Sequence, residues 1–306
     1  MEKRSMLIAV GIVAVLIVTA VGLSLALGGG NGSPEKTTIR QKGSDTMLEL
    51  ATAWAEQFQA EEPNMIVEVA GGGSGTGITA LKNKQVDIAQ SSRSMKATEI
   101  ADCIANGVNP IEFRVAIDGI AIITHSSNDI SNLTTAQLRG IYNGTISNWN
   151  QVGGPDLSIT LYGRQSTSGT YGYFMEHVLQ NGNYSASMQM MTGNAAIIDA
   201  VSGDAGGIGY VGIGYVMGVS GINIVPIKKT DASVAYSPLD SAAVLNGSYD
   251  IARYLYLYTD GTPENATLDW LSWILDAASG QSVAEEIGFY ALPPDVLASE
   301  RAKLDL

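Results

Sequence analysis

The stretch VAIDGIAIIT, residues 115–124, is a nearly unbroken apolar run, interrupted by one aspartate and one glycine. A short run of this kind is typical of a strand that is buried inside a sheet. From residue 38 onward, similar short apolar runs alternate with amphipathic stretches of helical pattern. This alternation predicts an α/β protein.

The order of these segments predicts two lobes. Helices are expected over residues 47–60, 78–84, 98–106, 135–142, 171–180, 195–202, 268–278 and 281–287, and strands over residues 65–69, 88–90, 115–124, 159–162, 207–211, 224–226 and 252–258. The apolar strands at 119–124 and 254–258 are the expected crossings between the lobes. We predict a first lobe made of residues 38–122 and 235–306, with residues 123–234 inserted as a second lobe.

Composition limits the classes of function. The 306 residues are 45% apolar and 15% charged, which is enough for one large or two medium domains with a proper core. A net charge of −13 argues against nucleic-acid binding, although a local group of backbone N–H donors can still hold a small anion. The single cysteine, Cys103, allows no internal disulfide, and no Cys/His cluster has metal-ligand spacing. We expect no metal and no cofactor.

The N-terminus predicts export. Lys3 and Arg4 precede an apolar run over residues 6–27, which as a helix would be about 33 Å long, enough to span a bilayer. Residues 1–27 are therefore a signal peptide or a membrane anchor, and the Gly-rich residues 28–37 a flexible tether. The positive-inside rule places the remainder outside the cytoplasm, at the cell surface or in a periplasm, tethered or secreted.

Four short segments rich in Ser, Thr and Gly are the candidate binding loops. They are GSDTM at 43–47, GGGSGTG at 71–77, SSR at 91–93 and RQSTSGT at 164–170. The first, second and fourth directly precede predicted helices, whose starts expose unpaired N–H groups and attract anions. Arg93 and Arg164 add planar donors suited to a tetrahedral oxyanion.

The same residues also fit simple helix caps. Thr46 with Glu49, and Thr134 with Gln137, match the capping-box spacing. Any single segment is explained better by capping than by binding. Three donor-rich helix starts together with two arginines favour an anion pocket.

Further short motifs accompany the loops: VDIA at 86–89, DGIA at 118–121 and GIGYV at 207–211. Together with the four loops, this series resembles the phosphate-binding proteins of ABC transporters, in order from about residue 39 to the C-terminus. The resemblance implies a type II periplasmic-binding-protein fold whose two lobes close over one phosphate. It also implies a monomeric binding protein, not an enzyme, which delivers phosphate to an ABC permease and its ATPase.

The resemblance also implies particular binding residues. Thr46 and Met47 match positions that present backbone N–H groups, and Thr46 adds a hydroxyl. Ser74 matches the serine of the glycine-rich loop. The anion loop of the second lobe contributes Arg164, Ser168, Gly169 and Thr170.

One position departs from the family pattern. Where some members place an aspartate that accepts the phosphate proton, this chain has Ser92, followed by Arg93. Phosphate carries at least one proton at neutral pH and sulfate none, so a buried carboxylate favours phosphate. Asp118 is our first candidate for this acceptor and Asp45 the second. Their structural alternatives are an ion pair with Arg93 or a strand end for Asp118, and a helix cap for Asp45.

Three alternative functions remain open from the sequence. A secreted hydrolase would need a base beside a serine, but no Gly-x-Ser-x-Gly or Ser-x-x-Lys motif is present. We interpret His125 and His177 as packing or surface residues. A second alternative keeps the fold but binds sulfate, molybdate or tungstate. A third is a tethered sensor or adhesive module.

Overall fold

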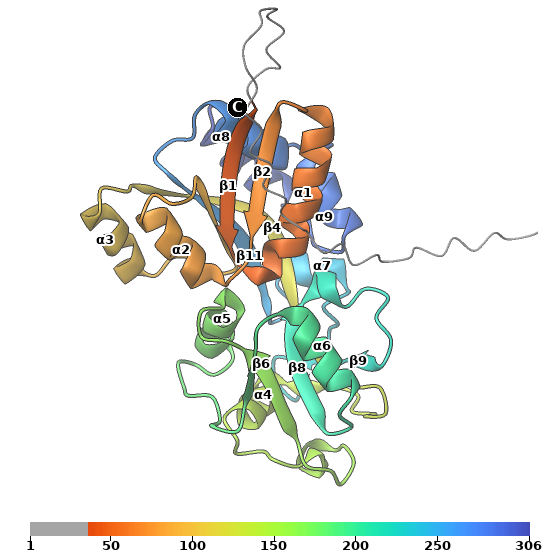
Figure 1. Ribbon diagram of the computed structural model, residues 1–306. Helices are drawn as coiled ribbons and strands as arrows, with labels where there is room; N and C mark the ends of the chain where they lie inside the picture. Colours follow the sequence, from red (N-terminus) through yellow and green to blue (C-terminus); the bar gives the residue numbers. More distant parts are fainter. Residues whose placement is uncertain (1–35) are drawn as a thin grey trace, which may run out of the picture. The chain divides into compact units, whose positions relative to one another are not determined.

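The computed structural model describes residues 36–306 (Figure 1). The predicted signal or anchor, residues 1–27, and most of the predicted tether lie outside the described residues. Within 36–306, no helix combines the length and apolar character needed to cross a membrane. The helices are α1 Leu48–Glu61, α2 Ser74–Lys82, α3 Ala97–Ala105, α4 Thr135–Tyr142, α5 Gly169–His177, α6 Asn194–Ser202, α7 Ser241–Leu245, α8 Asn265–Ile274, α9 Gly280–Glu286 and α10 Pro294–Ala302. The 3-10 turns are η1 Asp45–Met47, η2 Trp149–Val152 and η3 Ile213–Tyr215.

The strands of the described residues form a nine-stranded sheet and a separate pair, β5–β10. They are β1 Thr37–Gly43, β2 Met65–Ala70, β3 Ile88–Ser91, β4 Pro110–His125, β5 Leu133–Thr134, β6 Thr160–Arg164, β7 Gln189–Met191, β8 Gly207–Gly212, β9 Ile222–Ile224, β10 Ile227–Lys228 and β11 Ala252–Asp260. The large sheet has the order β2-β1-β3-β11-β4-β8-β6-β7, and β9 also pairs with β4. Strands β1, β2 and β3 are parallel, as are β6, β7 and β8, whereas β4 and β11 run antiparallel to their neighbours.

Strand β4 joins the two halves of this sheet. Its residues 110–119 pair with β11, and residues 120–125 pair with β8 and β9. Helices α1, α2 and α8 pack on the first half, and α5 and α6 on the second (Figure 1). The predicted two-lobed α/β fold is confirmed. Residues 254–258 do not cross between the halves, because among residues 36–306 β11 pairs only with β3 and the first part of β4.

Strand β1 was not predicted from the sequence, and neither was helix α10. The β1 sequence TTIRQKG looks polar, yet Gln41 is buried within the sheet. The Gln41 amide donates to Gln90 Oε1 at 2.8 Å and accepts from Trp270 Nε1 at 2.9 Å. A buried polar side chain with satisfied hydrogen bonds is stable in a core but leaves no apolar pattern to detect.

The two capping boxes have different outcomes. At α4, Thr134 Oγ1 accepts from Gln137 N at 3.1 Å and Gln137 Oε1 accepts from Thr134 N at 2.8 Å, which confirms that box. The box expected at Thr46 and Glu49 is wrong, because Thr46 lies inside the turn η1 and α1 begins only at Leu48. The Thr46 hydroxyl is thereby available for contacts outside its own helix.

Candidate functional site

The candidate loops begin where strands end. Strand β1 ends at Gly43, β3 at Ser91 and β6 at Arg164, and each is followed by one of the loops rich in Ser, Thr and Gly. The remaining loop connects β2 to α2. Ligands of open α/β sheets bind outside the carboxyl ends of the strands. The topology therefore places all four loops where such a ligand would bind.

Serine hydroxyls from three loops meet on the first half of the sheet. Ser44 Oγ lies 2.9 Å from Ser92 Oγ, and Ser74 Oγ lies 3.4 Å from it. The Ser92 N–H donates to Ser74 Oγ at 3.1 Å. All three serines are buried. These loops are far apart in the sequence, and the parallel pairing of β1 with β2 and β3 brings them together.

The loop before α5 reaches these serines from the second half of the sheet. Thr170 Oγ1 lies 2.7 Å from Thr46 Oγ1, and Gly75 N donates to Thr167 O at 3.1 Å. A Cβ placed on Gly169 would lie 2.6 Å from Ser92 Oγ and closer still to Ser74 Oγ. Ser168 caps α5, since its Oγ accepts from Thr170 N at 3.1 Å. Four hydroxyl-bearing residues, Thr46, Ser74, Ser92 and Thr170, gather here together with Gly169, which packs against Ser74 and Ser92. We call these five residues the hydroxyl cluster.

Arg164 is only 1% exposed and lies across the junction between the two halves. Its Nη2 donates to Asp45 Oδ2 at 2.7 Å and its Nη1 donates to Asn194 Oδ1 at 3.2 Å. Its buried Nε has no hydrogen-bond partner among residues 36–306. Burial lowers the pKa of Arg164, while Asp45 opposes this shift, and a guanidinium remains charged at neutral pH. Arg164 is thus a buried cation whose Nε–H donor has no partner among residues 36–306.

A tyrosine holds the backbone of Arg164 in place. Tyr210 Oη accepts from Arg164 N at 3.1 Å and donates to Tyr184 Oη at 3.2 Å, and Tyr184 Oη donates to Tyr171 O at 2.9 Å. Burial raises the pKa of Tyr210 to about 12, so its hydroxyl stays protonated at neutral pH. This chain of hydroxyls links the end of β6 to the start of α5.

We predict that Tyr210→Phe loosens this support. The variant leaves the buried Arg164 N–H without its acceptor, which costs about 1–3 kcal/mol. We expect the free energy of unfolding to fall by that amount, measured by urea denaturation, and the affinity for the anion expected at these loops to fall several-fold. Tyr236→Phe, at a tyrosine outside this network, is the control. Equal stabilities of Tyr210→Phe and the parent chain would contradict the supporting role.

Two carboxylates border the hydroxyl cluster. Asp118 is fully buried, and its Oδ1 accepts from Ile213 N at 3.0 Å while its Oδ2 accepts from Arg253 Nη2 at 3.0 Å. A Cβ on Gly212 would lie 2.9 Å from Thr46 Cγ2 and 3.3 Å from Asp118 Oδ1, so the carboxylate lies beside the cluster. Asp45 accepts from Gly72 N at 2.7 Å in addition to Arg164.

Comparison with known proteins gives the family. Residues 30–278 match the model of the PBP superfamily domain. The chain is 32% identical, over 282 residues and 86% of each chain, to the phosphate-binding protein PstS of Pseudomonas aeruginosa. The chain belongs to the PstS family within the PBP superfamily.

Solved structures agree with this family. A Clostridium perfringens protein solved with bound phosphate has 27% identity and a TM-score of 0.73, covering 84% of this chain and 100% of its own. An ABC-type phosphate transport receptor from Vibrio cholerae has 26% identity and a TM-score of 0.67, covering 83% and 100%. The two-lobed fold is therefore the one that these proteins share with this chain.

Three residues named from the sequence have hydrogen-bond partners within the protein. The Arg93 guanidinium forms two hydrogen bonds to Glu99, each 2.7 Å long, and lines a surface cavity of about 380 Å³. The Met47 N–H donates to Ser44 O at 3.1 Å within the turn η1. Ser168 Oγ accepts from Thr170 N and Tyr171 N at the start of α5, and its O–H remains able to donate. Arg253 contacts Asp118 and Thr170 directly, although no sequence motif marked it.

The histidines lie apart from the hydroxyl cluster. His125 Nδ1 is 2.7 Å from Ser127 Oγ, and His177 Nε2 is 2.6 Å from Asp250 O. Neither contact involves a serine of the cluster, so the serine–histidine pair that a hydrolase needs is not formed there. Within residues 36–306, no group of three or more His, Cys, Asp or Glu residues could hold a metal ion.

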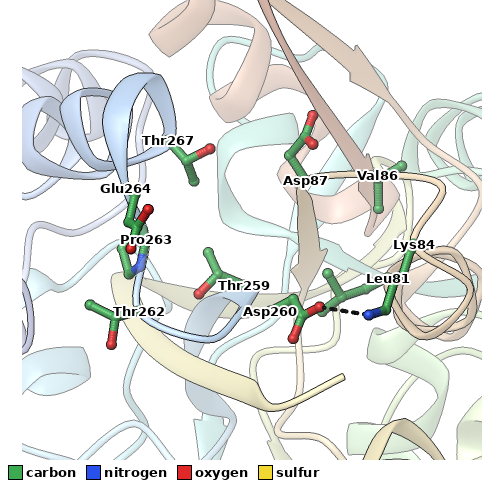
Figure 2. A pocket seen from close by; sticks show the side chains of 10 residues that line it. All are labelled: Leu81, Lys84, Val86, Asp87, Thr259, Asp260, Thr262, Pro263, Glu264 and Thr267. Carbon is green, nitrogen blue, oxygen red and sulfur yellow. Dashed lines mark ion pairs between the residues drawn. The ribbon is translucent and has the colours of Figure 1, made fainter. Parts of the chain in front are cut away.

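A surface cavity of about 410 Å³ lies between α2, β3, the end of β11 and the start of α8 (Figure 2). Lys84 Nζ and Asp260 Oδ2 form an ion pair across it at 3.6 Å. Asp87 and Glu264 add two further carboxylates, so acidic groups outnumber the single lysine. The cavity contains no member of the hydroxyl cluster and is a poor site for an anion.

Proposed function

We propose that this protein binds inorganic phosphate outside the cytoplasm, at the hydroxyl cluster between its two lobes, and delivers it to an ABC permease with its ATPase. The observation that carries the proposal is the convergence of Thr46, Ser74, Ser92, Gly169 and Thr170 beside buried Arg164. The phosphate-bound relative and the PstS relatives support the choice of anion.

The proposed site matches the chemistry of a tetrahedral oxyanion. Hydroxyls and helix-start N–H groups replace the hydration shell, and the start of α5 adds its positive dipole end. Arg164 supplies full charge from a buried position, where charge-assisted hydrogen bonds are strong. Loops from both halves contribute, so ligand contacts would favour closure of the lobes.

The proposal includes boundaries for the two lobes. We place the first lobe at residues 38–122 and 235–306 and the second at residues 123–234, with β4 as one connection. The protein acts as a monomer in this scheme, held to the membrane by residues 1–27 or released after their cleavage.

Calorimetric titration of residues 36–306 with phosphate, sulfate and tungstate tests the proposal. We expect one phosphate per chain, bound much more tightly than the other two anions at pH 7. Tighter binding of sulfate or tungstate would assign a different oxyanion, and no binding of any of the three would overturn the proposal.

Asp118 is the proposed acceptor of the phosphate proton, because it is fully buried beside Thr46. Asp118→Asn replaces an acceptor by an amide that can also donate. We expect phosphate affinity to fall by about 10- to 100-fold, the value of a hydrogen bond to a charged group, while sulfate affinity rises. Competition titration measures both. If Asp45→Asn changes the selectivity and Asp118→Asn does not, Asp45 is the acceptor.

A further inference from the structure

Arg253 is buried at the junction of the two halves and faces Asp118 directly across the sheet. The two residues are register partners in the antiparallel pair β11–β4. Arg253 Nη2 donates to Asp118 Oδ2 at 3.0 Å, and Nε donates to the same oxygen at 3.3 Å. Arg253 is 6% exposed, and its guanidinium lies over the Tyr173 ring at 5.3 Å. The Arg253 side chain thus lies between Asp118 on β4 and Tyr173 on α5.

The same guanidinium reaches the hydroxyl cluster. Nη2 also donates to Thr170 Oγ1 at 2.7 Å, and that oxygen lies 2.7 Å from Thr46 Oγ1. The remaining nitrogen, Nη1, is buried and has no partner among residues 36–306. Arg253 therefore connects Asp118 directly to the Thr170 hydroxyl and, through that hydroxyl, to Thr46.

Charge determines what Asp118 can do. A carboxylate that accepts the phosphate proton lies beside a second anion, and the two negative charges repel each other in a buried site. A guanidinium does not lose its proton in proteins, so it offsets this repulsion at every working pH. Without the two hydrogen bonds from Arg253, the Asp118 carboxylate loses its charged partner and is no longer held beside the hydroxyl cluster, and the distinction between the two anions would weaken.

We propose that Arg253 is a specificity-determining positioning residue, which keeps Asp118 a proton acceptor and aims the Thr170 hydroxyl, so that the site prefers phosphate to sulfate. This inference rests on the proposed phosphate site. Arg93 and Glu99 form a separate ion pair, so Arg93 does not substitute for Arg253.

Other charged groups line the cavities next to Arg253. One cavity that Arg253 lines also contains Lys96 and Glu176, and a second contains Lys229 and Asp250. No ion pair joins Arg253 to Glu176 or Asp250 within residues 36–306, whereas Arg253 and Asp118 are paired at 3.0 Å. We therefore attribute the expected effect of Arg253 on anion selectivity to its ion pair with Asp118.

The test compares phosphate and sulfate affinities of Arg253→Gln, Arg253→Lys and the double variant Asp118→Asn/Arg253→Gln, by competition calorimetry at pH 7. For Arg253→Gln we expect the ratio of phosphate to sulfate affinity to fall at least tenfold. Arg253→Lys retains the charge but not the fork, so phosphate affinity falls while the ratio is largely restored. In the Asp118→Asn background, Arg253→Gln changes the ratio no further. Arg40→Gln, which removes an exposed arginine paired with Asp87, is the control.

The outcomes separate this inference from the proposed function. If the parent chain does not bind phosphate, the proposed function fails. If the parent binds phosphate and Arg253→Gln keeps its selectivity, or weakens both anions equally, the role of Arg253 alone is overturned. Should Arg253→Gln not fold, Arg253→Lys decides, and unchanged affinity for phosphate would overturn the inference.

Discussion

Arg164→Met is expected to lower phosphate affinity by about 100- to 4,000-fold. Removing one partner of a buried charge pair costs about 3–5 kcal/mol, and this variant removes the buried cation beside the hydroxyl cluster. Arg164 is buried between Asp45 and Asn194, so no solvent-exposed cation can take its place. Titration calorimetry with phosphate measures the loss.

Arg139→Met is the matched control for this prediction. Arg139 lies on α4, and its Nε donates to the Val178 carbonyl at 2.8 Å, away from the hydroxyl cluster. Its replacement should leave phosphate affinity unchanged. The double variant Asp45→Asn/Arg164→Met separates loss of the phosphate contact from the cost of an unpaired Asp45. Phosphate affinity within threefold of the parent in Arg164→Met would remove Arg164 from the site.

Gly169→Ala is expected to abolish phosphate binding in the calorimetric range while the protein stays folded. The added Cβ would lie within 2.6 Å of Ser92 Oγ and closer to Ser74 Oγ, so the loop before α5 can no longer approach these serines. Atoms at such distances must move apart, and movement of the two halves relieves the clash without disturbing either core. Gly169 does not need a left-handed backbone, so the methyl group acts only by its volume.

Gly193→Ala provides the control for this steric effect. Gly193 directly precedes α6 on the same half of the sheet, and a Cβ there meets no atom within 4 Å. Calorimetry should show full phosphate affinity for this variant, and thermal unfolding should show both variants folded. If Gly169→Ala binds phosphate as tightly as the parent chain, phosphate binding does not require the loop before α5 to approach Ser74 and Ser92 closely.

Local patterns were sufficient to predict most helices and the four loops. The helix over residues 135–142 was predicted at its observed bounds, because its capping box and apolar periodicity agree. Strand β1 was missed because Gln41 is buried through hydrogen bonds to Gln90 and Trp270, not through hydrophobicity. Polar burial has no signature in one segment alone, since the partners lie far along the chain.

The sequence alone predicted that this protein has an α/β fold, that its Ser-, Thr- and Gly-rich loops are candidates for anion binding, and that Arg164, Ser74 and Thr170 are candidate binding residues. These conclusions depend on local hydrophobic period, on helix starts and on residue chemistry, which neighbouring residues specify. Only the tertiary structure paired Asp118 with Arg253, which no sequence motif marked, and paired Arg93 with Glu99. Arg253 is 135 residues from Asp118 in the sequence, and the register of β11 against β4 alone places them face to face. Pairing over such a distance is set by the packing of the whole sheet, which no single segment encodes.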